Sequence, residues 1–364
     1  MYAERVDRTR RRMAELGIDV VLLSVGADLP WLTGYRAMPL ERLTMLVLPV
    51  EGDATLVVPR LEAARVVEQP ELFALQPWDE TDDPVAIVAG LAGTPRTVAV
   101  GDRTWARFVL ELQARLPKPR WHSAGMVMGP LRSVKDDAEV VALRRASAAA
   151  DRVAAQLQGG EIALVGRTEA EVSAELGRRL LAEGHARVNF AIVAAGANAA
   201  SPHHDAGSRV VQAGEVVLCD FGGTMPDGYC SDITRCVATG EPSAELRDLY
   251  TVLEAAQAAA VDSAVVGTPC EDVDGVARRM ITEAGYGPYF VHRTGHGIGL
   301  EEHEDPYLVG GNCQALVAGH AFSIEPGIYL EGRFGARIED IVVATDAGPE
   351  PLNRVPHGLA VVEA

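Results

Sequence analysis

Several acidic residues end or interrupt apolar, strand-like runs in the second half of the chain. Asp220 and Glu325 each end such a run, and Glu339 lies inside one. A buried carboxylate without a compensating charge is costly, so each of these acids needs a cation nearby. For one acid alone, a salt bridge to an arginine is the simpler explanation, and Arg235 and Arg337 are available to form one.

The complete set of candidate residues favours a metal site over separate salt bridges. Four carboxylates and one glycine-flanked imidazole are ligands suited to manganese, cobalt, zinc or iron. Four negative charges balance two divalent ions, and bridging carboxylates would allow five side chains to hold both. A single zinc site would use fewer acids and more histidines or cysteines. We therefore predict a two-metal hydrolase whose ligands are Asp220, Asp232, His296, Glu325 and Glu339.

Histidines are concentrated in the same part of the chain, where six of the nine lie between residues 203 and 320. The run Gly295–Gly299 is not a dinucleotide-binding fingerprint, because its third glycine is one residue too early. Its glycines instead predict that neighbouring backbone crowds around His296. A single histidine would more often be structural, but His292 and His303 nearby indicate that this stretch lines a cavity. No Gly-x-Ser-x-Gly elbow, phosphate-binding loop or His-Glu-x-x-His motif offers a different chemistry.

The composition limits what kind of protein can carry such a site. A chain of 364 residues suggests two domains, and 48% apolar residues can fill a sizeable core. A net charge of −18 argues against nucleic-acid and anionic-membrane partners. No apolar run approaches the ~20 residues needed to span a bilayer. Five cysteines without a Cys-x-x-Cys pair fit a reduced, cytoplasmic protein.

Hydrophobic patterns predict an α/β domain in the first third of the chain and a series of longer helices after it. In the first third, a helix is expected over residues 4–16, and an α/β domain ends near residues 120–132. Short apolar runs predict its strands at residues 19–24, 43–49, 54–58 and 97–100. Farther along, helices are expected from about 135 to 157, from a capping box at Thr168 and Glu171 to 184, from 244 to 261 and from 271 to 284.

Two of these helices are preceded by weakly similar sequence segments. The segment 166–172 precedes a helix with a pair of arginines and a terminal glycine, and the segment 267–273 precedes another of the same kind. Chance similarity explains this as readily as duplication. Taken at face value, it predicts a duplicated helix–strand unit and a pseudo-symmetric site between its halves.

The order of the five predicted ligands resembles that of the "pita-bread" metallopeptidases, which include methionine aminopeptidase, aminopeptidase P and prolidase. The proline-peptidase branch is favoured by His203, His303 and Arg337, and the run Leu29–Gly34 is similar to a creatinase-like N-terminal domain. The resemblance covers nearly the whole chain, more loosely in the first third. The closely matching stretches are Ser231–Arg235, Gly295–Gly299, Ile324–Tyr329 and Arg337–Asp340.

This resemblance implies the fold and the cofactors. It implies an α/β chain with a creatinase-like domain over residues 1–130 and a pseudo-symmetric pita-bread catalytic domain over residues 131–364. It also implies two divalent metal ions per chain, manganese ahead of cobalt or zinc. A homodimer is expected, with Trp31 and Tyr35 as candidate contacts to a partner; ordinary core packing is the alternative for both.

Site roles follow from the same resemblance. One ion would take Asp232, His296, Glu325 and Glu339, and the other would take Asp220, Asp232 and Glu339. Glu325 would also be the general base, and His292 and His303 would steady the tetrahedral intermediate. On the substrate side the implied residues are His203, Arg337, which also orients neighbouring carboxylates, and Tyr329.

The sequence departs from the family pattern at two places. The interval from Asp220 to Asp232 is 12 residues, where the family usually shows 11, so a longer hairpin turn is expected and Asp227 becomes a competing ligand. Tyr307 stands where some prolidases carry an arginine that binds the substrate carboxylate. This second departure argues against strict dipeptidase specificity.

Three functions remain open from the sequence. The first is an Xaa-Pro peptidase acting on short proline-containing peptides, with prolidase ahead of aminopeptidase P. The second is a creatinase-like hydrolase, and the third is a non-catalytic binding protein with the same fold. Retention of all five ligands argues against the second and the third.

Overall fold

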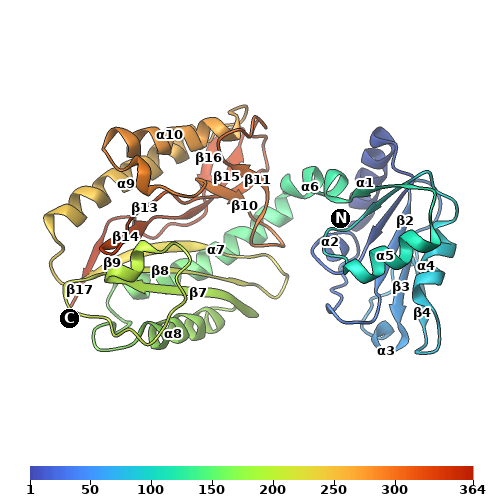
Figure 1. Cartoon of the computed structure of the whole chain (residues 1–364), viewed down its shortest axis with the longest axis horizontal. Coiled ribbons are helices and arrows are strands. Elements are labelled where there is room, and N and C mark those ends of the chain that lie inside the picture. Colours follow the sequence, from blue (N-terminus) through green and yellow to red (C-terminus); the bar gives the residue numbers. More distant parts are fainter. Residues whose placement is uncertain (364) are drawn as a thin grey trace. The chain divides into compact units, whose positions relative to one another are not determined.

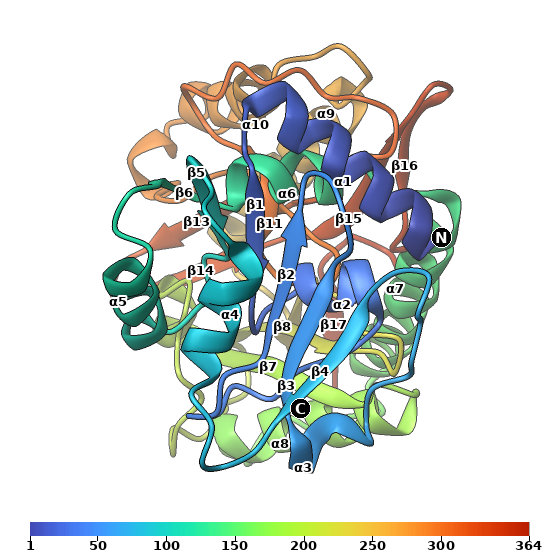
Figure 2. The ribbon, with the colours of Figure 1, turned by 90° about the vertical axis from the view of Figure 1, so that its right-hand side faces the viewer.

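A six-stranded sheet with the order β4-β3-β2-β1-β5-β6 forms the centre of the N-terminal unit, Met1–Arg132. Strands β1 and β2 are antiparallel, as are β2 and β3, whereas β4, β5 and β6 each join a neighbour in parallel. The computed structural model describes residues 1–363. Figure 2 shows β1 to β4 running side by side, with α4 near them. The strands are β1 (Val20–Leu23), β2 (Met45–Pro49), β3 (Thr55–Pro59), β4 (Ala74–Trp78), β5 (Thr97–Val100) and β6 (Arg120–Ser123). The helices are α1 (Tyr2–Leu16), α2 (Asp28–Thr33), α3 (Arg60–Ala63), α4 (Pro84–Ala92), α5 (Ala106–Arg115) and α6 (Gly125–Ser133).

Most elements expected in this unit are present, and the two strands without a sequence signal have a common property. The predicted helix and four strands correspond to α1, β1, β2, β3 and β5. The missed strands β4 and β6 are the two edges of the sheet. Their residues are mostly exposed or half-buried, so their sequences lack the continuous apolar run of the central strands.

Trp31 and Tyr35 are core residues rather than partner contacts. Trp31 is 1% exposed and Tyr35 is 6% exposed. The guanidinium of Arg5 lies over the Trp31 ring, 4.8 Å from its centre. Ordinary core packing, the alternative considered for both side chains, is therefore what the structure shows.

The second unit, from Ser133 onward, is built from two larger sheets and one hairpin. One sheet has the order β17-β9-β8-β7, the other has the order β11-β10-β12-β15-β16, and β13 pairs with β14. The strands are β7 (Arg187–Ala195), β8 (Val216–Thr224), β9 (Ile233–Thr239), β10 (Gly295–Gly297), β11 (Glu304–Leu308), β12 (Ala321–Ile324), β13 (Gly327–Leu330), β14 (Phe334–Arg337), β15 (Asp340–Thr345), β16 (Gly348–Pro351) and β17 (Ala360–Val362).

Helices cover the outer sides of these sheets. The helices are α7 (Asp137–Gln158), α8 (Glu169–Ala182), α9 (Ala244–Ser263) and α10 (Cys270–Glu283), with short 3-10 turns at Gly196–Ala200 and Gly287–Tyr289. Apolar side chains of α7 and α8 share a core with β7, β8 and β9, and those of α9 and α10 share a second core with strands β12 to β15. Figure 1 shows the strands of this unit lying between these two helical layers.

Equivalent backbone pairings support the predicted duplication. Thr168, before α8, forms an isolated antiparallel bridge with Val210, and Pro269, before α10, forms one with Ala315. The two similar segments, 166–172 and 267–273, therefore share the same kind of backbone bridge just before their helices. The predicted capping box is present at Thr168, whose side chain accepts from the Glu171 backbone N–H, while the Glu171 side chain accepts from the Thr168 N–H. The α/β class is confirmed, and the second unit repeats the helix–strand arrangement that the sequence predicted.

Two further expectations concern the whole chain. No helix within residues 1–363 is long and apolar enough to cross a membrane. All five cysteines are free; Cys313 is exposed and the other four are buried.

Candidate metal centre

The β8–β9 hairpin places two of the predicted ligands on one face. Asp220 lies on β8 and is paired with Thr234 of β9 in an antiparallel register. The same register sets Asp232, which directly precedes β9, opposite Gly222. Gly222 and Asp220 are two residues apart on one strand and so face the same side. The 12-residue interval between the two aspartates is thus compatible with both carboxylates entering one site.

Asp227, the competing candidate, belongs to the hairpin turn. The turn is closed by Gly228 N–H, which donates to the Met225 carbonyl at 2.8 Å. The Asp227 side chain is 33% exposed and forms an ion pair with Arg145. It is not among the residues that line the cavity described below, so the structure does not bring it to the ligand set.

The other three ligands come from neighbouring strands of the five-stranded sheet. His296 is the middle residue of β10, Glu325 follows β12, and Glu339 directly precedes β15. An isolated bridge between Thr234 and Glu339 joins this sheet to the β8–β9 hairpin. Across the bridge, the Thr234 hydroxyl donates to Glu339 Oε2 at 2.7 Å. The contact between the two sheets therefore creates the site.

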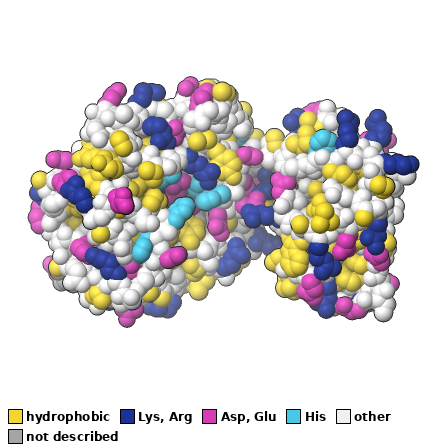
Figure 3. Space-filling model, viewed as in Figure 1, with side chains coloured by type: hydrophobic (Ala, Val, Ile, Leu, Met, Phe, Trp, Pro, Cys, Tyr) yellow, Lys and Arg dark blue, Asp and Glu magenta, His cyan; other side chains and the backbone are white. Residues whose placement is uncertain are grey.

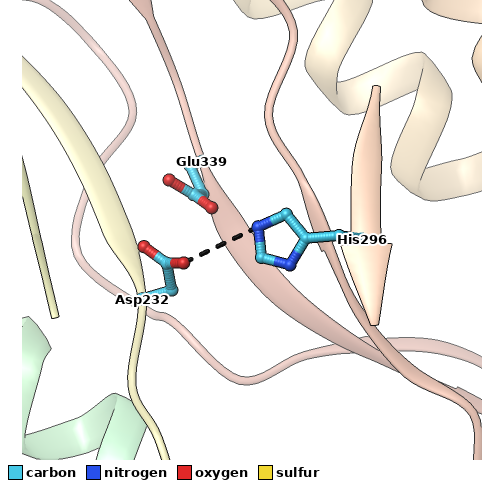
Figure 4. Close-up of side chains that lie close together, drawn as sticks. All are labelled: Asp232, His296 and Glu339. Carbon is cyan, nitrogen blue, oxygen red and sulfur yellow. Dashed lines mark ion pairs between the residues drawn. The ribbon is translucent and has the colours of Figure 1, made fainter. Parts of the chain in front are cut away.

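At this contact the predicted ligand atoms converge. One ligand atom each from Asp232, His296 and Glu339 lies within 4.8 Å of the others, and Figure 4 shows the three side chains pointing toward one another. His296 Nε2 is 3.7 Å from Asp232 Oδ2 and 3.3 Å from Glu325 Oε1. Asp220 lines the same cavity. The structure thus gathers all five predicted ligands.

The glycines beside His296 have a steric reason. A Cβ atom on Gly295 would lie 1.9 Å from the Ser323 carbonyl oxygen. A Cβ atom on Gly297 would lie 2.1 Å from the Asp305 carbonyl oxygen. The backbones of the strands on either side of β10 therefore approach too closely for any side chain, as the sequence pattern predicted.

The hydrogen bonds of His296 leave one ring nitrogen free for a metal. Burial lowers the pKa of His296 to about 3, so its imidazole is neutral near pH 7. Its Nδ1 lies 3.1 Å from the Gly297 carbonyl, which can only accept, so Nδ1 carries the proton. The lone pair then resides on Nε2, the atom that faces the carboxylates.

The ligand carboxylates are removed from water and repel one another, and a bound cation would stabilise their charges. Burial, followed by repulsion from neighbouring carboxylates, raises the pKa of Asp232 and of Glu339 well above the ordinary values. Burial also raises the pKa of Glu325 to about 7. Asp220 Oδ1 and Asp232 Oδ1 are buried and have no hydrogen-bond partner among the described residues. Hard oxygen donors and one neutral imidazole are suitable ligands for divalent metal ions. A bound metal ion would give the two unpartnered oxygens the interaction that they lack.

Arg235 and Arg337 form ion pairs with different acidic residues. Arg235 and Asp340 are both fully buried and form an ion pair at 2.7 Å, on the side of the strands away from the ligands. Arg337 donates to Asp220 Oδ2 at 2.6 Å and to the Thr234 hydroxyl at 3.0 Å. The simple salt-bridge explanation therefore holds for Asp340. Arg337 balances part of the charge of Asp220 and leaves its second oxygen free.

A hydrogen-bonded chain connects Arg337 to His292. Arg337 Nη1 donates to the Tyr329 hydroxyl oxygen at 2.7 Å, and this hydroxyl lies 2.8 Å from His292 Nε2. His292 Nδ1 lies 2.7 Å from the Arg293 carbonyl and must be the donor there, so Tyr329 donates to Nε2. Burial lowers the pKa of His292 to about 4, which fits this neutral form. Tyr329 itself is 4% exposed and does not line the cavity.

A cavity of about 400 Å³ opens over the ligands. His203 and His303 line it, and the His303 ring centre is 3.9 Å from that of His296. Figure 3 shows histidine side chains gathered beside acidic ones on one face of this unit. The lining residues are Phe190, Ile192, Pro202, His203, Asp220, Asp232, His292, Arg293, His296, Glu302, His303, Glu325, Arg337 and Glu339.

Two histidines of the histidine-rich region do not line the cavity, and three residues that contribute to the site were not predicted from the sequence. His204 pairs with Glu169, which is buried at the start of α8, and His320 is buried but does not line the cavity. Thr234, Arg293 and Glu302 contribute to the site without having been predicted. Each lies within two residues of a predicted site residue (Asp232, His292 and His303, respectively), and this proximity is the signal that the sequence offered.

Comparisons with known proteins agree with the geometry of the site. Residues 141–346 match the metallopeptidase family M24, and residues 5–134 match the creatinase/prolidase N-terminal domain. An Xaa-Pro dipeptidase of Lactobacillus delbrueckii subsp. lactis is 35% identical, over 98% of both chains.

Solved structures show the same relationship. The crystal structure of dipeptidase PepE from Mycobacterium ulcerans is 44% identical and has a TM-score of 0.94, covering 100% of this chain and 98% of that one. The X-Pro aminopeptidase of Thermotoga maritima is 30% identical with a TM-score of 0.85, covering 98% and 99% of the two chains. Each of these similarities extends over both units.

Proposed function

Because this chain belongs to metallopeptidase family M24, we propose that it hydrolyses the Xaa-Pro bond of short peptides with two divalent metal ions. The chain is a metallopeptidase by its family; the Xaa-Pro substrate and the use of two ions are the proposal. The observation that carries it is the convergence of one neutral imidazole with three buried carboxylates and the half-buried carboxylate of Glu325. Two of the buried carboxylate oxygens lack hydrogen-bond partners among the described residues. Prolidase, an Xaa-Pro dipeptidase, is placed ahead of aminopeptidase P.

The residues that would hold the ions follow from the site. Asp232, His296, Glu325 and Glu339 would hold one ion, and Asp220, Asp232 and Glu339 would hold the other. When bound, the two ions supply an activated water nucleophile and polarise the peptide carbonyl. Manganese is the expected metal, with cobalt and zinc as alternatives that share these ligands.

Glu325 is the residue suited to accept the proton of the nucleophile. Its carboxylate lines the cavity beside the other predicted ligands, where it can take up a proton from a metal-activated water. The Ser323 hydroxyl donates to its Oε1 at 3.1 Å, and the Glu325 backbone N–H donates to the Thr294 carbonyl at 2.8 Å. These contacts fix both the side chain and the backbone of the proposed base.

His292 and His303, the two histidines expected to be catalytic, differ in whether their ring nitrogens are available. His303 lines the cavity and has no hydrogen-bond partner among the described residues, so its ring nitrogens are available to the substrate and to the oxyanion. Both nitrogens of His292 are already used, one by Tyr329 and one by the Arg293 carbonyl. We propose that His303 contacts the tetrahedral intermediate directly and that His292 shapes the adjacent wall.

The cavity also offers a surface for a proline ring. An Xaa-Pro bond is a tertiary amide without an N–H, so recognition cannot depend on that donor. Phe190, Ile192 and Pro202 form an apolar wall near His203. Such a wall suits a rigid, apolar ring that makes no hydrogen bond of its own.

A side-by-side assay tests the proposal. The purified protein loaded with Mn²⁺ is given Xaa-Pro dipeptides and Xaa-Pro-Yaa tripeptides, and release of the first residue is measured. We expect cleavage of the dipeptides. Cleavage of the tripeptides alone would favour aminopeptidase P, the reading that the similarity to an X-Pro aminopeptidase supports. Cleavage of neither would contradict the proposal.

The remaining expectations are part of the same proposal. We assign residues 1–130 to the creatinase-like domain and residues 131–364 to the catalytic domain. A homodimer is expected, and sedimentation analysis of the purified protein tests it.

A further inference from the structure

The segment 196–209, between β7 and β8, carries two residues of the cavity wall but has little regular structure of its own. After the 3-10 turn Gly196–Ala200, residues 201–209 form neither helix nor strand. Pro202 and His203 of this segment line the cavity. The side chain of His203 is exposed and has no hydrogen bond or ion pair among the described residues. Its position therefore depends on what fixes the backbone on either side of it.

One buried carboxylate, that of Glu169, holds the segment on both sides of His203. Glu169 is the first residue of α8 and is 0% exposed. The Asn198 amide donates to its Oε1 at 3.0 Å and to its Oε2 at 3.1 Å. His204 Nε2 lies 2.8 Å from Oε2 and must be the donor there, because an ionised carboxylate can only accept. Asn198 precedes His203 by five residues and His204 follows it directly, so one side chain fixes both ends of this stretch.

Backbone groups complete the contacts between Glu169 and the segment. The Ala195 N–H donates to Oε1 at 2.9 Å, and the Gly207 N–H makes a longer contact of 3.5 Å with Oε2. In the other direction, the Glu169 N–H donates to the Arg209 carbonyl at 2.9 Å, and the Ala170 N–H donates to the Gly207 carbonyl at 3.0 Å. These bonds use N–H groups that the first turn of a helix leaves free, and they attach the segment to α8.

Glu169 keeps its negative charge in this buried position. Burial raises the pKa of its carboxyl group, but hydrogen bonds from Ala195, His204 and Asn198 outweigh burial, and the pKa is lower than the ordinary value. An ionised acceptor binds N–H donors about twice as strongly as a neutral one. A glutamine at this position would also place an NH₂ group opposite at least one of the donors. The arrangement of donors therefore requires a carboxylate.

We propose that Glu169 is a positioning residue of the active site, which holds the segment 196–209 so that His203 and Pro202 form part of the cavity wall. This inference rests on the peptidase function proposed above, and it adds a residue that does not itself line the cavity. From the cavity side, Arg337 Nη1 reaches the Pro202 carbonyl only at 3.4 Å, so this contact is weak. The buried side of the segment thus provides most of its support.

A double-mutant cycle tests whether Glu169 acts through His203. The Mn²⁺-loaded wild type, Glu169→Gln, His203→Ala and the double variant are assayed with Ala-Pro. We expect Glu169→Gln to reduce kcat/KM by about tenfold, mainly through KM, the size of one lost charge-assisted hydrogen bond. Once His203 has been removed, Glu169→Gln should change kcat/KM by less than about twofold. Losses that multiply in the double variant would overturn the proposal.

Matched variants separate this contact from a general disturbance of α8. The control is Glu171→Gln, which alters an exposed carboxylate of the same helical turn that accepts from Thr168 and should leave kcat and KM unchanged. His204→Gln keeps an N–H donor for Glu169 and should retain most of the activity, whereas His204→Ala should resemble Glu169→Gln. Equal losses in the two His204 variants would overturn the proposal. If Glu169→Gln does not fold, His204→Ala takes its place in the cycle with His203→Ala.

Hydrogen exchange shows whether the effect is confined to the segment. The Mn²⁺-loaded wild type, Glu169→Gln and Glu171→Gln are compared by mass spectrometry. We expect amides of residues 196–209 to exchange at least about tenfold faster in Glu169→Gln, while peptides of β8 and α9 exchange as in the wild type. Unchanged exchange in the segment, or faster exchange throughout the catalytic unit, would overturn the proposal.

A binding measurement keeps the inference distinguishable from the proposed function. Calorimetric titration with a non-cleavable Ala-Pro analogue, in which CH₂ replaces the peptide carbonyl, is carried out on the four proteins of the cycle. Weaker binding in Glu169→Gln that disappears once His203 is replaced supports the inference even if no peptide is cleaved. Cleavage of Ala-Pro by the wild type, together with losses of affinity that multiply in the double variant, supports the function and overturns the inference.

Discussion

Arg337 donates to one oxygen of Asp220 at 2.6 Å, while the other oxygen of Asp220 is buried and has no partner among the described residues. The guanidinium thus orients the carboxylate and balances part of its charge, and it leaves one oxygen for a metal ion. The same guanidinium also reaches Thr234 and Tyr329. Arg337 therefore contacts the predicted ligand Asp220, the residue Thr234 at the bridge between the sheets, and Tyr329, which hydrogen-bonds to His292.

Arg337→Lys should impair the enzyme although it keeps the charge. An ammonium cannot make the three separately directed contacts of the planar guanidinium. We expect kcat/KM for Ala-Pro to fall by about tenfold or more, together with weaker Mn²⁺ binding in a calorimetric titration. Arg333→Lys, at an exposed arginine near the same hairpin, is the control. Unchanged metal binding and unchanged activity in Arg337→Lys would show that charge alone is sufficient.

Glu325→Gln should remove the general base while preserving the fold. The amide has nearly the shape of the carboxylate but cannot accept the proton, and general-base catalysis contributes about 10² to 10⁴ in rate. We expect kcat for Ala-Pro to fall by at least about 100-fold, with the circular dichroism spectrum unchanged. Persistent hydrolysis would contradict the role of Glu325.

Metal analysis should distinguish the two ion positions. The wild type dialysed against Mn²⁺ should contain close to two ions per chain, because four carboxylates balance two divalent ions. Asp220→Asn weakens only the position that Asp220 helps to form, so about one ion should remain. Asp232→Asn alters a bridging ligand and should weaken both. Stoichiometry is measured by atomic emission, and equal values for all three proteins would be inconsistent with these assignments.

Asp340→Asn should destabilise the catalytic unit strongly. The change leaves the guanidinium of Arg235, which is fully buried, without its ion pair, at a cost of about 3–5 kcal/mol. Glu350→Gln removes an exposed pair with Arg144 and should cost about 1 kcal/mol or less. Urea unfolding of the metal-free proteins is followed by circular dichroism, because all four tryptophans lie in the N-terminal unit. Similar midpoints for the two variants would contradict the expectation.

His320 should make the folded state sensitive to acid. Burial, followed by the charge of Lys135, lowers the pKa of His320 to about 4, compared with about 6.5 in an unfolded chain. Between these values the unfolded state binds a proton that the folded state does not, so stability falls as the pH falls. The contribution is complete above pH ~6.5 and is lost by pH ~4, amounting to at most about 3 kcal/mol.

The measurement compares the wild type with His320→Gln. A glutamine oxygen can still accept from the Val317 N–H, which donates to the His320 ring at 3.3 Å, but it does not titrate. The free energy of unfolding of the metal-free variant should depend less steeply on pH between 6.5 and 4. Parallel curves for the two proteins would show that His320 does not contribute.

Local sequence signals were sufficient for many elements and for the chemical type of the site. The Thr168–Glu171 capping box and the central strands follow from interactions between near neighbours and from continuous burial, which the amino-acid order records directly. The glycines around His296 follow from the absence of space, which no other residue type tolerates. The edge strands β4 and β6 were missed because half-exposed strands need no apolar run.

The pairing of charges was decided by the tertiary structure. The sequence alone specified two arginines and several acids in strand-like runs, and it supplied the ligand types of a metal site. It did not specify that Arg235 pairs with Asp340 while Arg337 takes one oxygen of Asp220. Strand alternation separates the two faces, but which acid meets which arginine depends on how two sheets, distant in sequence, pack together. For the same reason, only the fold placed Arg293 over Tyr307, because that contact requires β10 and β11 to lie side by side.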